Sequence, residues 1–435
     1  MTALPESAAA SADPMLDPTP TEAFRREAAP RRGFLFFLVL ASVGAASAQM
    51  SVALLTLSLK ANQIDADDAT SILALASGIA GILALVGLPI VGRLSDQSRS
   101  RAGRRRPFLI AGAVAFALGA ALMITATDAW SLTAANLAFT LGSICAGVIT
   151  TALIADQLPA NRRGLPSALI SLSTPVGALL GIGLSQPFGS SVLALVLIPT
   201  ALAVLGLVAL SLFLRDPQFI QERKPFHLLE LVGVFWVNPL RHPAFALAFA
   251  SRMLVFSGVA AINAFQAIYL LDHLGFAPQE LGSAILLTVL INTGVSLLVA
   301  PIMGKLSDRI GRRKPFVVIA AVILAIGLLL AASATTFEFY LAALVVVAIG
   351  QGVYFSVELA LASQVLPDPD NPAKDLALIN VANNLPVSIV AAVAPALLAV
   401  GVAANDPKNY SALFIAGAVS ALIGAVAVSF IRSVR

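Results

Sequence analysis

The sequence predicts an all-α membrane protein whose twelve transmembrane helices form two pseudo-symmetric six-helix bundles. Three observations predict this fold class: the composition, a series of long apolar runs, and a loop motif that occurs twice. Of the 435 residues, 58% are hydrophobic and 11% are charged, whereas a soluble domain has about 45–50% apolar and about 25% charged residues. Most of the molecular surface is therefore not expected to face water.

The apolar runs are each continuous over about twenty residues, which is the length of a helix that crosses a hydrocarbon core of about 30 Å. Transmembrane strands would instead alternate in polarity over about ten residues. We expect spans at residues 34–58, 70–91, 107–127, 132–157, 165–187, 191–214, 244–271, 281–303, 315–334, 338–362, 376–400 and 410–431.

These spans divide the chain into two bundles, residues 34–214 and 243–435, joined by a cytoplasmic linker over 215–242. Residues 1–33 are rich in Ala, Pro, Ser and charge, and are expected to be a disordered cytoplasmic segment without a secretory signal. The apolar core of the linker, residues 227–236, is too short to span. It is expected either to lie along the membrane surface as an interfacial helix or to be a plain linker.

Basic residues indicate the orientation of the spans. They gather before span 1 and in the loops after spans 2, 4 and 8: Arg25, Arg26, Arg31, Arg32, Arg93, Arg99, Arg101, Arg104, Arg105, Arg106, Arg162, Arg163, Lys305, Arg309, Arg312, Arg313 and Lys314. The loops on the other side contain only Lys60 and Lys408. Because positive loops stay in the cytoplasm, we expect a multi-pass protein of the cell inner (plasma) membrane with both termini cytoplasmic.

The net charge of +4 therefore reflects topology, and no nucleic-acid partner is expected. Four aromatic residues near the outer span ends are expected at the membrane interface: Trp130, Tyr269, Tyr340 and Tyr410.

The reactive residues give no support to an enzyme. The single cysteine, Cys145, lies in an apolar run, so neither an intrachain disulfide nor a thiolate metal site can form. The three histidines fall in loops without a ligand pattern, and the sequence has no phosphate-binding Gly-rich loop, HExxH motif or nucleophile elbow. We therefore expect no catalytic residues, no metal and no cofactor.

A loop motif occurs once in each half of the chain. Gly92-Arg-Leu-Ser-Asp96 recurs as Gly304-Lys-Leu-Ser-Asp308, an offset of 212 residues (304 − 92). Gly103-Arg-Arg-Arg-Pro-Phe108 recurs as Gly311-Arg-Arg-Lys-Pro-Phe316, an offset of 208 (311 − 103), and this offset holds to the end of span 4. The sequence thus predicts two six-helix halves in the same orientation, an arrangement that places a substrate site between the halves near the bilayer midplane.

The second copy, Gly-x-Leu-Ser-Asp-Arg-x-Gly-Arg-Arg-Lys at 304–314, resembles the cytoplasmic loop motif of the major facilitator superfamily. With the spans and the repeat, the resemblance covers about residues 34–432. It implies the major facilitator fold, in which spans 1, 4, 7 and 10 surround a central cavity.

The longer first copy, at 95–108, is similar to the loop of the sucrose–proton symporters and their glycoside–cation relatives. Segments at 252–258, 364–367, 373–376 and 380–386 are similar to bacterial members of that group. This resemblance implies cation-coupled sugar uptake. Proton–sugar symporters of another branch carry an acidic residue in span 1, and since this chain has none, their mechanism does not carry over.

The repeated loop has a mechanical interpretation. Asp96 and Asp308 close spans 2 and 8 beside arginines at a water interface, where a carboxylate accepts charge-assisted hydrogen bonds. Such pairs are expected to latch one cytoplasmic packing arrangement; the alternative is anchoring by charge alone. The expected cytoplasmic gate consists of Gly92, Asp96, Arg104, Gly304, Asp308 and Arg312.

Two charged residues lie deep in the predicted spans. Arg252 lies in span 7, and Glu358 lies near the inner end of span 10. A charge deep in a span costs about 2.5–3.5 kcal/mol on insertion scales, so each should face a cavity or a partner. The 208 offset places Thr150 opposite Glu358 (358 − 150), so the two charges belong to the second half alone.

The hypothesis is proton coupling, in which Glu358 exchanges a proton while Arg252 competes for the carboxylate. Burial favours the neutral carboxyl group and a nearby guanidinium favours the charged one. The alternative is a permanent structural ion pair. Asp156, at the end of span 4, is a further candidate for proton coupling; its alternative is a surface carboxylate near Arg162 and Arg163.

Neutral hydrogen-bonding residues in the spans are the candidates for substrate binding, because a hydroxyl-rich solute needs amide groups and an aromatic platform. Each could instead tie helices together, as amides do in lipid. The candidates are Gln49, Asn263, Gln266, Asn292, Gln351, Tyr354, Asn380, Asn383 and Asn384.

Three functions follow as hypotheses. The first is a secondary active transporter that works by proton-coupled symport of a sugar or glycoside, with alternating access. The second is proton-coupled efflux of drugs or other amphipathic compounds, for which fewer amides are expected. The third is a sensor or scaffold, which would carry a soluble output domain. The expected partners are a small-molecule substrate, a coupling cation (a proton) and the lipid bilayer, and the chain is expected to be a monomer. Pro175 and Pro386 are expected to kink spans 5 and 11 or to be tolerated there.

Overall fold

The computed structural model describes residues 31–159, 162–188, 191–216, 241–362, 372–401 and 408–431. Over these residues the chain folds into helices joined by short loops, which confirms the predicted all-α class. The segment expected to be disordered lies outside the described residues up to position 30, as does the core of the linker, residues 227–236.

The first half contains α2 (Phe34–Ser51), the π-helical turn η1 (Val52–Thr56), α3 (Leu57–Ile64), α4 (Ala69–Asp96), α5 (Arg106–Thr125), α6 (Ala129–Gln157), α7 (Gly164–Ser171), α8 (Ser173–Gly183), the short 3₁₀ helix η3 (Gln186–Phe188) and α9 (Val192–Phe213). The second half contains α11 (Pro243–Asp272), α12 (Leu281–Ile310), α13 (Lys314–Ala332), α14 (Phe337–Ala362), α15 (Pro372–Leu398) and α16 (Tyr410–Ser429). Span 1 is α2–η1–α3 and span 5 is α7–α8; each other span is one helix.

Within the described residues, 11 helical segments are long and apolar enough to cross a membrane. The remaining helix, α15, contains a shorter apolar stretch, Leu385–Leu398. The helices begin and end within a few residues of the predicted spans, except that several continue for one or two turns into the loops. The chain is therefore a multi-pass membrane protein.

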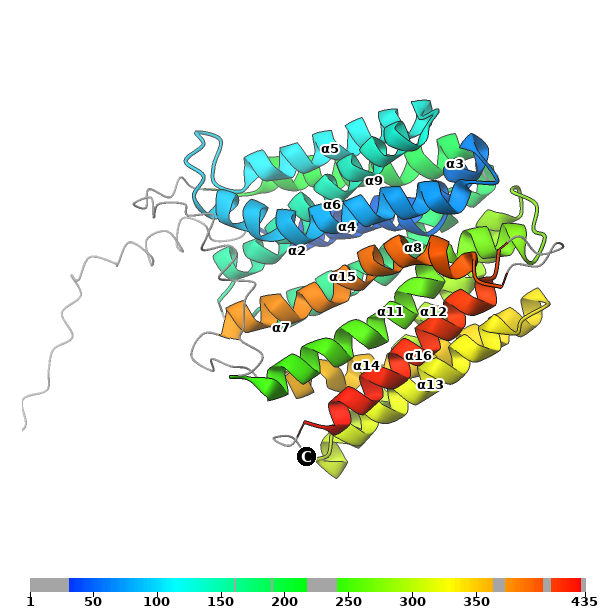
Figure 1. The fold of residues 1–435 in the computed structure, drawn as a ribbon. Coiled ribbons are helices and arrows are strands. Elements are labelled where there is room, and N and C mark those ends of the chain that lie inside the picture. Colours follow the sequence, from blue (N-terminus) through cyan, green and yellow to red (C-terminus); the bar gives the residue numbers. More distant parts are fainter. Residues whose placement is uncertain are drawn as a thin grey trace, which may run out of the picture.

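The helices form two bundles that lie side by side (Figure 1). In the first bundle α2 packs against α8 and α9, and α5 and α4 pack against α6. In the second, α13 packs against α14 and α16, and α11 packs against α15 and α16. The bundles touch where α4 meets α15, where α8 meets α12, and where η1 and α3 meet α11.

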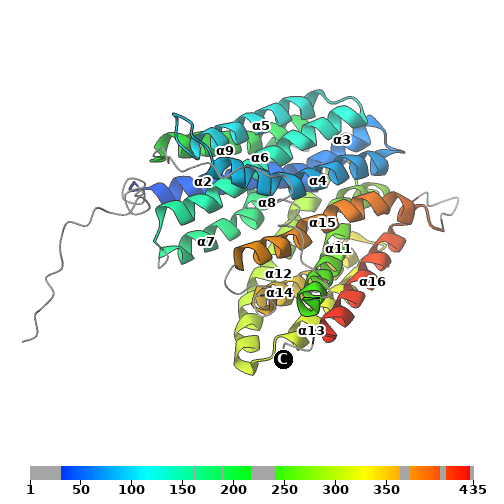
Figure 2. The same ribbon diagram turned by 60° about the vertical axis from the view of Figure 1, so that its left-hand side comes forward.

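The two ends of the bundles differ in charge. We call the end with the loops at 97–105 and 311–313 the basic end, and the end with the loops at 65–68 and 273–280 the opposite end. In Figures 1 and 2 the bundles lie closer together at the opposite end and diverge toward the basic end. Contacts across the bundles agree with this view, since Gly183 of α8 lies against Leu286 of α12 near the opposite end.

Equivalent residues make equivalent contacts in the two halves. Gly103 and Gly311 both have positive φ (109° and 69°), a conformation that glycine adopts without a steric penalty. A β-carbon on Gly92 would lie 3.8 Å from Val148, and one on Gly304 would lie 3.7 Å from Ser356. The last two partners are again 208 positions apart (356 − 148), so the sequence repeat is also a structural repeat.

Span 5 is broken as its proline predicts. Because proline lacks an N–H and its ring clashes with the carbonyl four residues earlier, Pro175 cannot support the helix at Ser171. The helix ends there, and α8 starts after Leu172. Pro386 lies inside α15, which is a single helix.

The α8 half of span 5 is held closely by α2. A β-carbon on Gly181 would lie 2.4 Å from the Ser47 carbonyl oxygen, and one on Gly177 would lie 2.6 Å from Ala46 Cβ. Small residues four apart let membrane helices approach in this way. The α7 half has mostly exposed side chains and lacks such a contact with α2.

The outer aromatic residues are a correction to the sequence analysis. Trp130 is 69% exposed, as expected of an interface residue. Tyr269, Tyr340 and Tyr410, by contrast, are buried inside the second bundle, where the Tyr269 ring lies 5.1 Å from the Tyr340 ring and 5.4 Å from the Tyr410 ring. The Tyr269 hydroxyl donates to the Ala334 carbonyl at 3.0 Å. The interface prediction was wrong for the tyrosines because a position near a span end does not tell which side of the helix faces lipid.

Candidate functional site

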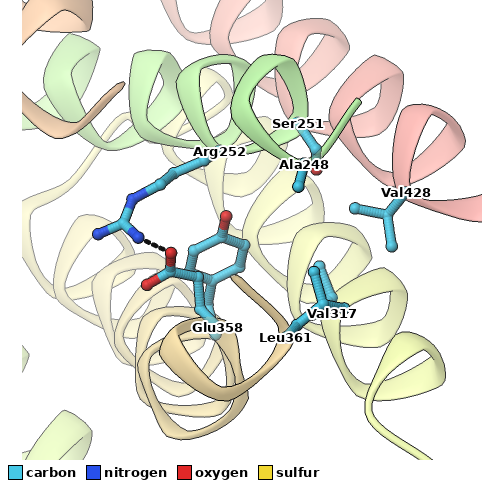
Figure 3. Close-up of a pocket in the computed structure, with 8 residues that line it drawn as sticks. Ala248, Ser251, Arg252, Val317, Glu358, Leu361 and Val428 are labelled. Carbon is cyan, nitrogen blue, oxygen red and sulfur yellow. Dashed lines mark ion pairs between the residues drawn. The ribbon is translucent and has the colours of Figure 1, made fainter. Parts of the chain in front are cut away.

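Arg252 of α11 and Glu358 of α14 form an ion pair inside the second bundle, with Arg252 Nη1 against Glu358 Oε1 (Figure 3). Their side chains are only 6% and 7% exposed. Two charges removed from solvent are tolerated when they neutralise each other. The pair joins the two helices toward the basic end of the bundle.

The ion pair borders a small cavity of about 10 Å³. Helices α11, α13, α14 and α16 contribute its lining residues, which are Ala248, Ser251, Arg252, Val317, Tyr354, Glu358, Leu361 and Val428. The Ser251 hydroxyl on this wall donates to the Gly424 carbonyl of α16 at 2.7 Å. Each of the two charged side chains therefore has a partner and borders a cavity, as its burial requires. The cavity lies within the second bundle.

Phe256 connects the ion pair to the aromatic residues of α14. The Arg252 guanidinium carbon lies 5.6 Å from the Phe256 ring centroid, a cation–π contact. The same ring meets the Tyr354 ring edge-on at 5.9 Å and the Phe355 ring at 5.8 Å. A change in the position of Arg252 would thus be felt by both aromatic side chains.

The candidate substrate residues fall into groups that differ in burial. Gln49 on α2 is half-buried, and its Oε1 is buried without a hydrogen-bond partner among the described residues. Asn263 on α11 is exposed and Asn292 on α12 is half-buried. Gln266 on α11, with Gln351 and Tyr354 on α14, is buried. The side chains of Asn380, Asn383 and Asn384 lie outside the described residues.

At the predicted gate of the first bundle, the ion-pair network centres on Arg105, which sequence reasoning missed. Asp96 pairs with Arg104 at 2.6 Å and with Arg105 at 2.8 Å. Arg105 Nε also donates to Asp156 at 2.8 Å, and its Nη1 donates to Ser95 Oγ at 2.5 Å. Asp156 therefore belongs to the gate network and pairs with Arg105, where Arg162 and Arg163 were expected beside it.

At the predicted gate of the second bundle, the ion pair is longer. Asp308 pairs with Arg313 at 3.6 Å, whereas the predicted Arg312 is exposed. The ion-pair partner of Asp308 is thus Arg313, the counterpart of Arg105 (313 − 105 = 208), and the gate role of Arg312 stays a prediction.

Sequence reasoning also missed two hydrogen bonds, each of which joins two helices of the same bundle. Arg106 donates to the Leu214 carbonyl at the end of α9, and Lys314 donates to the Ile431 carbonyl after α16 at 2.8 Å. Asp216 accepts the backbone N–H groups of Arg105 and Arg106 at 2.6 and 2.8 Å, which caps α5. This role of Asp216 was not predicted, because the residue was assigned to the linker expected to begin at residue 215.

At the opposite end Lys408 links the bundles. Its Nζ lies 2.8 Å from Asp272 Oδ2, which also accepts from the Tyr410 hydroxyl at 2.8 Å. Lys408 Nζ donates as well to the Ala66 carbonyl of the first bundle at 3.4 Å. A sequence signal for this role existed, because Lys408 is one of two lysines on this side. Within the described residues no group of three or more His, Cys, Asp or Glu side chains could hold a metal ion.

Comparison with known proteins agrees with this fold. A family model described as Major Facilitator Superfamily matches residues 33–299 and 248–435. The multidrug resistance protein MdtG of Citrobacter koseri is 28% identical over 263 residues, which are 57% of this chain and 59% of that protein. The match thus spans less than two thirds of the length of that relative.

Solved structures share the fold. The nucleoside transporter NupG has a TM-score of 0.70 at 16% identity, covering 92% of this chain and 98% of that chain. The D-xylose-proton symporter has a TM-score of 0.66 at 18% identity, covering 92% and 97%. A bacterial homologue of the human lysosomal transporter Spinster, solved inward-facing and unoccupied, has a TM-score of 0.66 at 15% identity, covering 95% and 96%. The chain belongs to the major facilitator superfamily, and it is a transporter and not an enzyme.

Proposed function

We propose that the chain is a secondary active transporter that takes up a sugar or glycoside together with a proton, by alternating access between its two bundles. The observation that carries the proposal is the buried Arg252–Glu358 pair. An isolated pair of opposite charges inside a membrane bundle is a functional site by default, because apolar residues would fill the space at lower cost.

The proton step uses the pair directly. A proton that reaches Glu358 neutralises the carboxylate and removes its attraction for Arg252. The guanidinium then loses the attraction of that carboxylate, and Phe256 transmits its movement to α14. Loss of the proton restores the pair. A carboxyl group whose two protonation states favour different packing can couple a proton gradient to a conformational change.

The orientation follows from the loops. The arginine-rich loops at the basic end support a cytoplasmic location for that end and for both termini, in an inner membrane. The divergence of the helices toward the basic end (Figure 2) then supports an inward-facing arrangement.

Polar residues on α2 and α11 support a hydroxyl-rich solute. Gln49 carries a buried amide oxygen without a hydrogen-bond partner in the described part of the chain, and Asn263 exposes its amide on α11. The fold neighbours include a nucleoside transporter and a xylose–proton symporter, whose solutes carry sugar hydroxyls. A second candidate function is proton-coupled efflux of amphipathic compounds, which the partial match to a multidrug resistance protein favours.

The test is transport in proteoliposomes, with radiolabelled sucrose and xylose and an imposed proton gradient. Glu358→Gln should abolish gradient-driven accumulation and spare solute exchange, because exchange needs no net proton movement. Glu338→Gln is the matched control, since Glu338 is an exposed carboxylate on the same helix. Normal accumulation in Glu358→Gln would end the proposal for the pair. Transport of neither sugar, with proton-driven efflux of ethidium in everted vesicles, would favour the second function.

A further inference from the structure

Phe355 of α14 is an exposed aromatic side chain close to the ion pair. It is 48% exposed, whereas Tyr354, the aromatic candidate from the sequence, is 4% exposed. Glu358 follows Phe355 by three residues, about 4.5 Å along the helix axis. Because a solute cannot stack on a ring that other side chains cover, Phe355 and not Tyr354 offers an aromatic surface to a solute.

The contacts of α14 determine the direction in which Phe355 points. Gly352 faces α12, since a β-carbon there would lie 2.9 Å from a side chain of that helix, and Glu358 faces α11 through the ion pair. At about 100° per residue, Phe355 lies about 60° round the helix from each of them, on the side between α12 and α11. Gly350, which meets α13, is about 140° away. Phe355 therefore points between α11 and α12.

The direction between α11 and α12 leads to the first bundle. Both helices meet the π-helical turn η1 of span 1. Gln49, whose amide oxygen has no hydrogen-bond partner among the described residues, lies three residues before this turn. The exposed side of the Phe355 ring therefore faces the boundary between the bundles, with span 1 opposite.

Asn263 adds a polar group on the α11 side of this boundary. It is exposed, and it follows Phe256 by seven residues, which places both on one face of α11, about 10 Å apart along the axis. The Phe256 ring in turn lies 5.8 Å from the Phe355 ring. An exposed aromatic ring and an exposed amide thus border the same space at neighbouring levels.

From this geometry we propose that Phe355 is the aromatic platform of the solute site, on which the apolar C–H face of a sugar ring lies while the sugar hydroxyl groups bond to the Asn263 amide. The inference rests on the proposed sugar transport, and it moves the platform from Tyr354 to Phe355. Ligand sites combine aromatic surface, which supplies affinity, with a few polar groups that fix orientation. A sugar ring suits such a site because it carries C–H groups on its faces and hydroxyl groups at its edge.

Phe256 connects the platform to the ion pair. Its ring contacts the Phe355 ring at 5.8 Å and the Arg252 guanidinium carbon at 5.6 Å. A cavity of about 10 Å³ borders both phenylalanines, which leaves their rings room to tilt. A solute that presses on Phe355 therefore reaches Arg252 through a single side chain, and this contact gives the platform a place in the coupling of solute to proton.

The first measurement tests which way residue 355 faces, and it needs no solute. Phe355→Cys and Ile326→Cys are made in the full-length protein, reconstituted in liposomes and treated with a charged, water-soluble methanethiosulfonate; the wild type is the blank, because Cys145 is buried. Phe355 and Ile326 are almost equally exposed, at 48% and 49%. Ile326 lies on α13, which Figures 1 and 2 show on the side of the second bundle away from the first. We expect Phe355→Cys to react about tenfold faster or more, because a charged reagent enters lipid poorly.

The second measurement tests whether the ring binds solute. Proton-driven uptake of radiolabelled sucrose and xylose is measured for Phe355→Ala, Phe355→Leu and Phe355→Tyr. We expect KM to rise by about three- to tenfold in the first two variants, as one aromatic contact is lost, and to stay near the wild-type value in Phe355→Tyr. KM does not depend on the amount of folded protein. Phe339→Ala is the matched control, since Phe339 is 43% exposed on the same helix but lies about 160° round it from Phe355.

Each remaining result would overturn the platform. Labelling of Phe355→Cys at the rate of Ile326→Cys would show that the ring faces lipid. Fast labelling with an unchanged KM in Phe355→Ala and Phe355→Leu would show that the ring borders the solute path without holding solute. Both results leave sugar uptake by the wild type standing. If the wild type takes up neither sugar, the proposed function fails and the sugar platform fails with it.

Discussion

Gly81 of α4 and Ser388 of α15 meet where the two bundles touch, so closely that a β-carbon on Gly81 would lie 1.7 Å from Ser388 Oγ. Ser388 is buried at this contact. A large side chain at position 81 would therefore press against Ser388, whose own Cβ lies 3.0 Å from that β-carbon position, and force the bundles apart. Because few other elements join the two bundles, this single contact has a large influence on the conformation that the protein adopts.

Gly81→Leu should shift the protein away from the described conformation and open the opposite end. A cysteine at Leu286, between α8 and α12, reports on this opening, because the one natural cysteine is buried. We expect its labelling by a maleimide in detergent to rise severalfold. Gly78→Leu is the control on the same helix, since a β-carbon there would have no neighbour within 4 Å. Equal labelling in both variants would contradict the role of the close contact.

Lys408→Gln should weaken the same end more gently. The variant loses the ion pair with Asp272 and the hydrogen bond to the Ala66 carbonyl across the bundles. A partly exposed pair contributes about 0.2–1 kcal/mol, which corresponds to a change in labelling of about two- to fivefold at most. Lys60→Gln serves for comparison, because Lys60 Nζ donates to the Ile124 carbonyl inside one bundle. If the two lysine variants label alike, Lys408 does not join the bundles.

Arg105→Gln should destabilise the first bundle. The substitution leaves Asp156 half-buried without its guanidinium partner and removes a bond to Ser95. We expect a loss of about 1–3 kcal/mol in the free energy of unfolding, detected as a lower thermal midpoint in detergent. Arg312→Gln should change stability by less than about 0.5 kcal/mol, because its side chain is exposed. A larger loss of stability in Arg312→Gln than in Arg105→Gln would contradict the role of Arg105 and support Arg312, the residue that the sequence suggested.

Arg252→Gln should be more harmful than the double variant Arg252→Gln/Glu358→Gln. Removing one partner of a buried pair leaves an uncompensated charge, a cost of about 3–5 kcal/mol, whereas neutralising both partners is often tolerated. Unfolding of the two single variants and the double variant gives the coupling between the side chains. Additive effects would mean that the two residues do not depend on each other in the folded protein.

Much of the fold could be predicted from the sequence, because a lipid bilayer permits few backbone structures. A run of apolar residues must be helical to satisfy its own backbone, so the spans were predictable to within a few residues. The repeat at 92–108 and 304–316 predicted equivalent halves. The cost of a charge in lipid also indicated that Arg252 and Glu358 need partners.

The details of the site could not be predicted in the same way. Arg104, Arg105 and Arg106 are adjacent in sequence, and only the bend before α5 determines that the first two turn back to Asp96 while Arg106 reaches the Leu214 carbonyl. Asp216 caps a helix more than 100 positions earlier in the chain, a contact that no local pattern encodes. The burial of Gln351 and Tyr354 could likewise not be predicted, because the hydrophobicity of a span does not show which side of the helix faces lipid and which faces the bundle.

The ties that Arg106 and Lys314 make to the ends of α9 and α16 have a mechanical consequence. Each of these hydrogen bonds joins the third and sixth spans of one half, and neither crosses to the other half. Under the proposed alternating access, we therefore expect each half to move as a stiff unit, with the change concentrated at the contacts of Gly81, Ser388 and Lys408 between the halves.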